Sequence, residues 1–265
     1  MKLPMKPTTV MLALLTLALL GGAVEHLQGG QKSSKSGSDS VESSATFTRS
    51  ITFSGYEWLV KDGFSGPGPN RFSDSPRNVW VDQQGRLHLR IERRRGRWYA
   101  AEVVLAQTTG YGTYRFGVDS RVDNLDLNAV LGLFTWCTNP AADNCEIDIE
   151  LSRWGDELNQ NAGYVVQPYD EPGHVYSFEL PPESPTTHSF TWRPSDVFFQ
   201  SENGVHDPLG SIDPIQSWTY VQAVPPPAGA SARINLWLRG GLRPASKKNK
   251  SIEVVISSFT FEPLP

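Results

Sequence analysis

The sequence predicts an all-β fold, a two-sheet antiparallel β-sandwich, and three observations lead to this prediction. Short segments of alternating apolar and polar residues recur between clusters of Gly, Pro, Asn and Asp, which is the pattern of strands joined by turns. No window of roughly 11 or more residues carries an apolar stripe at helical spacing. Many short strands in one large domain favour two packed sheets.

The composition supports a folded domain and excludes several classes of protein. The 265-residue chain has 38% hydrophobic, 11% aromatic and 20% charged residues, which excludes a wholly disordered chain and suffices for a full core. The formal net charge of −4 argues against nucleic acid as a partner, because such binding needs a basic surface. Two cysteines are too few for a disulfide-rich scaffold or a four-cysteine zinc site.

The N-terminus predicts a signal peptide over residues 1–23. Lys2 and Lys6 precede an apolar run over 10–20, and small residues follow this run, which is the pattern of a cleaved secretory signal. The run is shorter than the roughly 20 apolar residues of a membrane span. We therefore expect a secreted or periplasmic protein. The alternative is that the segment stays uncleaved and anchors the protein to the membrane.

The rest of the chain divides into a linker and one domain. Residues 24–45 are rich in Ser and Gly and almost free of apolar side chains, so they predict a flexible linker before a domain over 46–265. The run RRRGR at 93–97 predicts the charged tip of a hairpin. Alternation of apolar and polar residues predicts strands at 86–91, 114–122, 130–136, 146–151, 188–192, 234–238 and 252–261.

Candidate chemistry lies in the strand predicted at 146–151, which reads EIDIEL. Side chains alternate along a strand, so Glu146, Asp148 and Glu150 share one face while the apolar residues between them take the other. Three carboxylates in line repel each other, and this repulsion costs stability. The arrangement therefore indicates a function for the charges.

The spacing suits a pair of catalytic carboxyl groups. The Cα atoms of Glu146 and Glu150 lie about 13 Å apart on an extended strand. Inward-leaning side chains can bring the two carboxyl groups to about 5–5.5 Å, the separation of a retaining glycosidase pair. The charge of Asp148 between them should raise a neighbour's pKa, as a general acid near neutral pH requires. Two alternatives stay open: a solvent-exposed acidic face, and a calcium site, although calcium ligands usually come from loops.

The residues of this acidic strand resemble a motif of a known protein family. The string EIDIE at 146–150 resembles the catalytic signature of glycoside hydrolase family 16, whose members include licheninases and laminarinases. Pieces before and after this string also resemble family segments in the same order: TTGYGTYRFGVDSRV at 108–122, LGLFTW at 131–136, THSFTWRPSDVFFQSENG at 187–204 and RINLWLRGG at 233–241.

The resemblance implies a concanavalin-A-like jelly roll with a concave substrate cleft. It also implies that Glu146 is the nucleophile, Glu150 the acid/base and Asp148 the residue that assists between them. The signature has no extra residue before its last Glu, so it is similar to the licheninase type and not to the bulged form of many laminarinases. The sequence departs from the family at Asn144 and Cys145, where members often place a Trp. It departs again where FFQSENG replaces a Val-Asp-Gly ending.

Six residues outside the acidic string are candidates for binding a sugar chain: Trp136, Gln167, Trp192, Asn235, Trp237 and Arg239. Asn235, Trp237 and Arg239 alternate with two leucines, so we expect all three on one strand face, toward the cleft. A Trp face stacks well on a sugar ring. Packing in the core is the alternative for the Trp residues, because Trp is usually mostly buried.

The two cysteines bracket a short loop before the acidic string. In an exported protein, the spacing of Cys137 and Cys145 predicts a disulfide, with two free buried thiols as the alternative.

Metal and cofactor sites find little support in the sequence. The five histidines show no HxH or HExxH spacing, so no catalytic zinc is predicted. We expect no required cofactor, and a structural calcium has no support in the sequence.

Three functions stay open. The first is an exported retaining endo-glycosidase acting on a β-glucan-like polysaccharide. The second is a lectin-like sugar-binding protein on the same fold, since fold does not decide function. The third is a transglycosylase, in which a sugar instead of water attacks the intermediate. The Glu146 and Glu150 pair favours an enzyme, because a pure binder has no need of aligned, repelling acids. We expect a monomer with a polysaccharide or oligosaccharide partner and no nucleic-acid partner.

Overall fold

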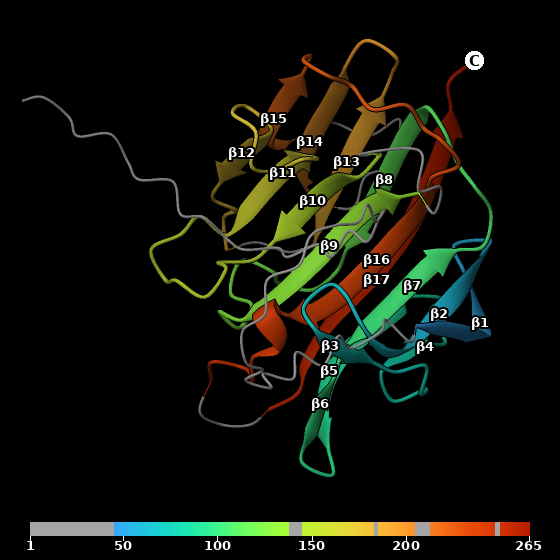
Figure 1. Cartoon of the computed structure of the whole chain (residues 1–265), viewed down its shortest axis with the longest axis vertical. Coiled ribbons are helices and arrows are strands. Elements are labelled where there is room, and N and C mark those ends of the chain that lie inside the picture. Colours follow the sequence, from blue (N-terminus) through green and yellow to red (C-terminus); the bar gives the residue numbers. More distant parts are fainter. Residues whose placement is uncertain (1–44, 138–144, 183–184, 205–212, 247–249) are drawn as a thin grey trace, which may run out of the picture.

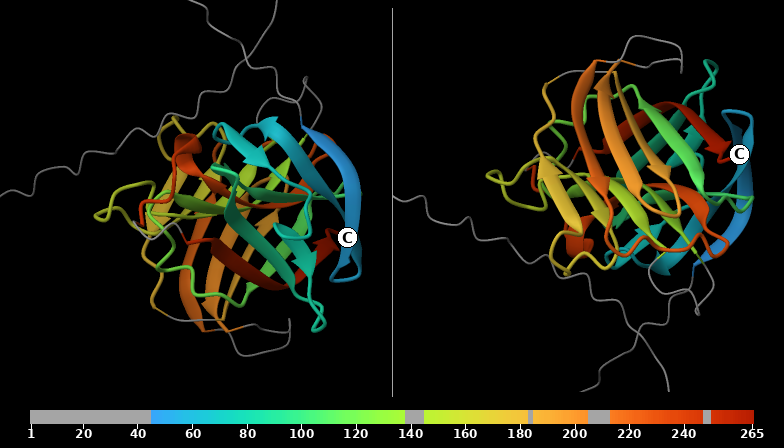
Figure 2. Two further views of the ribbon diagram at one scale, coloured as in Figure 1. Left: turned by 90° about the horizontal axis from the view of Figure 1, so that it is seen from below. Right: turned by 90° about the horizontal axis from the view of Figure 1, so that it is seen from above.

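The computed structural model describes residues 45–137, 145–182, 185–204, 213–246 and 250–265. These residues form two antiparallel β-sheets that pack face to face (Figure 2), so the predicted all-β sandwich is confirmed. The signal peptide predicted over 1–23 and nearly all of the linker predicted over 24–45 lie outside the described residues. In the described part of the chain, no helix is long and apolar enough to cross a membrane.

The first sheet has nine strands, and its outer face carries the acidic residues. In spatial order these strands are β1 (Thr46–Phe53), β2 (Tyr56–Ser65), β7 (Ala101–Leu105), β16 (Ser231–Leu238), β9 (Ala129–Trp136), β10 (Ile147–Leu151), β11 (Ala162–Val166) and β12 (Val175–Phe178), with β3 (Asn70–Phe72) paired to β2.

The second sheet has eight strands and packs against the inner face of the first. In spatial order they are β15 (Pro214–Tyr220), β14 (Val197–Asn203), β13 (Thr186–Trp192), β8 (Gly112–Val118), β17 (Ile252–Pro263), β5 (Leu87–Arg94) and β4 (Val79–Val81), with β6 (Arg97–Tyr99) paired to β5. A single turn of 3-10 helix, η1 (Arg239–Gly241), follows β16 in the described chain.

The predicted strands all fall on strands of the structure, with shifted ends. The strand expected at 114–122 ends at Val118, and the next residue, Asp119, pairs with Arg86 at 3.0 Å. The charged run at 93–97 is the predicted hairpin tip. There Arg94 of β5 lies opposite Arg97 of β6 in the strand register, and Arg95 and Gly96 turn the chain with φ angles of 47° and 81°.

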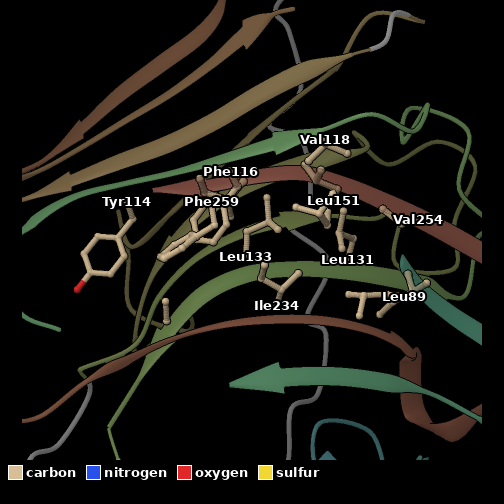
Figure 3. Packing of buried hydrophobic residues seen from close by; sticks show 14 of the residues in the cluster. Leu89, Tyr114, Phe116, Val118, Leu131, Leu133, Leu151, Ile234, Val254 and Phe259 are labelled. Atoms are coloured by element: carbon tan, nitrogen blue, oxygen red, sulfur yellow. The ribbon is translucent and has the colours of Figure 1, made fainter. Parts of the chain in front are cut away.

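The hydrophobic core lies between the two sheets (Figure 3). Buried side chains from β9, β10 and β16 meet those from β8 and β17; the labelled examples include Leu131, Leu133, Leu151, Ile234, Phe116, Val118, Val254 and Phe259. Burial of each such side chain stabilises the fold by about 1.5–3 kcal/mol. Because side chains alternate, the strands that fill this core present their other residues on the outer face of the nine-stranded sheet.

Candidate active site

The three acidic residues lie along β10, which runs between β9 and β11 in the nine-stranded sheet (Figure 1). Ile147, Ile149 and Leu151 are fully buried in the core. Asp148 and Glu150 therefore point to the outer face, and Glu146 directly precedes the strand. The alternation predicted from the sequence thus places the carboxylates on the outer face, and the strand order keeps β10 away from the edges of the sheet.

Two glycines leave room around Glu150. Glu150 lies opposite Gly132 of β9 and Gly163 of β11, so no side chain flanks it in register. The Gly132 N–H donates to Asn235 Oδ1 at 3.1 Å, and a methyl group at Gly132 would lie only 2.5 Å from that oxygen. A side chain at Gly132 would therefore displace Asn235 and fill the space beside Glu150.

Asp148 connects the carboxylates to a neighbouring strand. Its buried carboxyl group hydrogen-bonds with that of Glu146 and accepts from Gln167 Nε2 at 3.4 Å. The Gln167 backbone N–H donates to the Glu146 carbonyl at 3.1 Å. Gln167, a candidate for sugar contacts, thus holds the Glu146 and Asp148 end of β10.

Burial and mutual charge raise the pKa of all three carboxyl groups. Burial, and then the charge of Asp148, hold the pKa of Glu150 well above its ordinary value. Burial, the charge of Glu146 and the hydrogen bond with it raise the pKa of Asp148. Burial, with smaller contributions from the charges of Glu150 and Glu102, raises the pKa of Glu146 to about 8, although the hydrogen bond from Asp148 and the charge of Arg233 oppose this rise. Within this hydrogen-bonded pair, Glu146 therefore ionises at a lower pH than Asp148.

These raised pKa values predict an unusual dependence of stability on pH. The unfolded chain loses its carboxyl protons near the ordinary value of about 4.3, whereas the folded chain holds them to higher pH, so stability falls as pH rises above that value. We expect the melting temperature to fall between pH 5 and pH 8. The Glu150→Gln variant should be more stable than the wild type at pH 8 by on the order of 1 kcal/mol, or about 2–4 °C.

Differential scanning calorimetry across this pH range measures the effect. The control is Glu57→Gln, an exposed glutamate on β2, which should leave the pH profile of the wild type unchanged. An identical pH profile in Glu150→Gln and the wild type would show that Glu150 is not held protonated.

Trp136 and Asn235 lie on the same outer face as the carboxylates. Asn235 is buried between Gly132 and Glu102 in the register of β9, β16 and β7. Trp136 is half-buried at the end of β9, and the Arg233 guanidinium lies 5.8 Å from its ring centre. The structure thus brings these two candidates together with the acidic residues.

Trp237 faces the outer side of the sheet but is covered there. Its side chain is only 4% exposed and packs with Phe72, Ala100 and Val130. Trp154 contacts its ring edge-on at a centroid distance of 5.8 Å. The ring of Trp237 supports neighbouring side chains in this structure, and the half-buried Trp154 is the more accessible aromatic of the pair.

The structure contradicts the placement of two candidates, Trp192 and Arg239. Trp192 belongs to β13 of the eight-stranded sheet, is fully buried in the core, and donates its indole N–H to the Pro225 carbonyl at 3.0 Å. Arg239 lies beyond the end of β16, in η1, and not on the strand face. Its guanidinium lies against Gly155, where a methyl group would overlap it. The alternative of core packing therefore holds for Trp192.

Sequence reasoning missed three charged residues on this face: Lys61 of β2, Glu102 of β7 and Arg233 of β16. Glu102 pairs with both Lys61 and Arg233. Arg233 stands two residues before Asn235, so the same alternation that selected Asn235 places it on that face. Glu102 interrupts the apolar run AAEVVLA at 100–106, and a charge within a buried strand is a signal that was available in the sequence.

A hollow lies beside Gln167, the residue that contacts Asp148. It is lined by Gln167, Pro168, His174 and residues 223–226. His174 is fixed there by hydrogen bonds with the Val166 carbonyl at 2.9 Å and the Tyr220 hydroxyl at 3.0 Å. Gln167 therefore links the hollow to Asp148, and hydrogen bonds hold the His174 side of the hollow in place.

A disulfide joins Cys137, directly after β9, to Cys145, directly before Glu146, with their Cα atoms 6.0 Å apart. The loop between them, 138–144, lies outside the described residues. The described residues contain no group of three or more His, Cys, Asp or Glu side chains placed to hold a metal ion.

The position of the disulfide predicts a functional effect larger than its effect on stability. It closes a short loop, so its removal should destabilise the protein by at most the roughly 3 kcal/mol of a 15-residue loop. Because it fixes the residue before Glu146, the Cys137→Ser/Cys145→Ser variant should lose a larger fraction of activity than of thermal stability. Calorimetry and a turnover assay test this on one sample. A variant that melts much earlier but keeps full activity at low temperature would contradict it.

The protein is thus a β-sandwich with three neighbouring carboxyl groups on the outer face of one sheet. No family model and no curated protein matches the chain. Among solved structures, it is similar to the Bacillus licheniformis β-glucanase, with 18% identity and a TM-score of 0.58 over 77% of this chain and 91% of that chain.

Two further solved structures are similar at comparable levels. A β-1,3-1,4-glucanase (lichenase) from a mouse hindgut metagenome has 17% identity and a TM-score of 0.55 over 78% of this chain and 93% of that chain. A pseudo β-1,3-glucanase of Mycobacterium tuberculosis has 21% identity and a TM-score of 0.55 over 76% and 88% of the two chains. The chain therefore has the jelly-roll fold of β-glucanase and lichenase structures, as the sequence resemblance implied.

Proposed function

We propose that this protein is an exported, retaining endo-glycosidase that hydrolyses O-glycosidic bonds of a β-glucan-like polysaccharide. One observation carries the proposal: Glu146, directly before β10, lies in line with Asp148 and Glu150 on its outer face, and the hydrogen bond from Asp148 favours the ionised form of Glu146 while burial holds the pKa of Glu150 well above its ordinary value. A double displacement needs this division of roles, with one ionised nucleophile and one protonated acid.

In the first step Glu146 attacks the anomeric carbon of the sugar. A bond forms between a Glu146 carboxylate oxygen and this carbon as the bond to the leaving oxygen breaks. Glu150 gives its proton to that oxygen, so the leaving chain departs as a neutral alcohol. Asp148 donates a hydrogen bond to Glu146 and orients it for attack.

In the second step water releases the sugar. Glu150, now ionised, takes a proton from a water molecule, and the water oxygen attacks the anomeric carbon as the bond to Glu146 breaks. Glu146 regains its charge and Glu150 its proton. Two inversions at the same carbon retain the anomeric configuration. The space that Gly132 and Gly163 leave beside Glu150 suits the approach of both the leaving chain and water.

Three further observations support the proposal. The solved structures that share the fold include proteins called β-glucanase and lichenase, which favours a β-glucan as substrate. The signal-peptide pattern over 1–23 favours export, and an exported protein can reach polysaccharides outside the cytoplasm. One solved structure with a similar fold is called a pseudo β-1,3-glucanase. Sugar binding without turnover is therefore the second candidate function.

Reducing-end detection on purified protein tests the proposal. The panel is lichenan, laminarin, xyloglucan, agarose and carrageenan, with Glu146→Gln as the inactive control. We expect new reducing ends from a β-glucan, with the product configuration retained by NMR. Longer chains without net new reducing ends would identify a transglycosylase. Binding to a glycan without any turnover would identify a lectin-like protein and contradict the proposal.

A further inference from the structure

A second hollow, the arginine hollow, lies at the end of the sandwich where β16 ends and η1 begins (Figure 1). Its volume is about 200 Å³, and the β2–β3 and β5–β6 hairpins contribute its walls. Two exposed arginines line it, Arg71 of β3 and Arg97 of β6, together with the half-buried rings of Phe64 and Trp98. The Arg71 guanidinium lies 5.0 Å from the centre of the Phe64 ring, which keeps this cation at the wall.

Fixed backbone forms the floor of the arginine hollow. Asn70 is buried there, and its side chain bonds both backbone polar groups of Leu238. Its Nδ2 donates to the Leu238 carbonyl at 2.8 Å, and its Oδ1 accepts from the Leu238 N–H at 3.2 Å. Gly241 packs so closely on the Pro69 carbonyl that a methyl group at Gly241 would overlap that oxygen. The hollow is therefore formed before any ligand binds.

Four arginines of the two hairpins make no ion pair among the described residues: Arg71, Arg93, Arg95 and Arg97. By contrast, Arg77 and Arg94 both pair with Glu92. Arg97 lies directly opposite Arg94 in the strand register, and like charges in that position repel each other. An anion bound in the arginine hollow would relieve this repulsion.

The arginine hollow adjoins the face that carries the carboxyl groups. Asn235 lies in the register row of Glu150, and Leu238, which lines the hollow, lies three residues further along β16. The hollow therefore begins about 10 Å along the sheet from that row. Trp154 follows Glu150 by four residues and contacts Trp237, which directly precedes Leu238. A sugar chain bound along this face would reach the hollow across these aromatic side chains.

The chemistry of the walls favours an anionic sugar polymer. The planar fork of a guanidinium matches the oxygens of a carboxylate or a sulfate ester, and an aromatic ring such as Trp98 packs well on the face of a sugar. The formal net charge of the whole chain is −4, so the cationic hairpins are a local feature. A nucleic acid would need a more extended basic surface.

We propose that the arginine hollow is a second glycan-binding site, in which Arg71 and Arg97 bind a carboxylate or sulfate group carried by a β-glucan-like polysaccharide. The inference deepens the proposed function, on which it rests for the course of the sugar chain along the acidic face. It narrows the substrate class to an acidic polysaccharide. Binding at this site does not require turnover, so the two proposals can be tested separately.

Isothermal titration calorimetry on the full chain carrying Glu146→Gln, the parent protein, tests the inference without hydrolysis. The probes are laminarin and its carboxymethyl and sulfate derivatives at matched substitution. We expect the parent to bind at least one derivative about tenfold or more tightly than laminarin, since a hydrogen bond to a charged group is worth that much. Adding Arg71→Gln/Arg97→Gln should remove most of this preference and leave laminarin binding unchanged. The derivative that loses affinity identifies the anion.

The matched control adds Arg121→Gln/Arg193→Gln to the parent. These exposed arginines lie outside the hollow, and their removal changes the net charge equally. Because Arg71 and Arg97 are exposed, their variant should melt with the parent. An equal loss of affinity in the control would overturn the inference.

Two further results would also overturn it: no preference of the parent for either derivative, or tighter binding of an oligonucleotide of matched charge. A wild type that is inactive on every polysaccharide, while its parent variant shows the expected preference, would refute the proposed function and uphold the site. Hydrolysis of laminarin by the wild type without any preference in the parent would do the reverse.

Discussion

The Glu146→Gln variant is expected to lose turnover by at least about 10⁴-fold, because removal of a covalent nucleophile leaves only binding and transition-state contacts. Glutamine keeps the shape of the side chain and can still accept the hydrogen bond from Asp148. The loss therefore reports the missing negative charge and not a cavity. Steady-state hydrolysis of the preferred β-glucan, measured as new reducing ends, gives the size of the effect.

Azide rescue separates the nucleophile role from a general loss of folding. In Glu146→Ala, the vacated space lets azide attack the anomeric carbon, and the single inversion gives a glycosyl azide of the opposite configuration to the substrate. The exposed Glu57→Gln variant is the matched control and should keep wild-type activity. Near-normal activity in Glu146→Gln would show that Glu146 is not the nucleophile.

The Glu150→Gln variant should show a loss that depends on the leaving group. Hydrolysis of a polysaccharide needs a proton for the leaving oxygen, so its rate should fall by about 10²–10⁴-fold. An aryl glycoside with an activated leaving group needs no such proton, and its first step should be nearly unaffected. The alkaline limb of the pH profile should also disappear, because the protonated Glu150 produces that limb.

Pre-steady-state measurement of phenol release resolves this first step. A burst of phenol followed by slow turnover is the expected trace, because the second step still lacks its general base. Equal losses for the polysaccharide and the activated glycoside would show that Glu150 does not act as the acid.

The alternation of side chains was enough to predict the face of the acidic residues. It is a local rule, so Glu146, Asp148 and Glu150 separate from Ile147, Ile149 and Leu151 in any register. The same rule placed Asn235 and Trp237 on the outer face of β16. It did not predict that Phe72 and Trp154 would cover Trp237, because these residues come from β3 and from the segment after β10.

The remaining features depend on contacts that are distant in sequence. Trp192 lies on a strand, as expected, but this strand, β13, belongs to the eight-stranded sheet and not to the sheet that carries the acidic residues. Nothing local in the sequence shows to which sheet a strand belongs. Arg239 is not on the strand face because β16 ends at Leu238 and η1 begins at Arg239. The pairing of Glu102 with Lys61 and Arg233 joins residues 41 and 131 positions apart. Such pairs follow from the strand order, which sequence periodicity does not specify.

Covalent trapping tests the central claim, that Glu146 is the nucleophile of a retaining glycosidase, most directly. The protein is incubated with an activated 2-deoxy-2-fluoro-oligoglucoside, whose fluorine slows the second step more than the first, and its digest is analysed by mass spectrometry. We predict a single glycosyl group on the peptide that contains Glu146, with fragment ions that place it on that residue, and no label in Glu146→Gln. Label on Glu150 or on another residue, or complete hydrolysis of natural substrate with inverted configuration, would contradict the account.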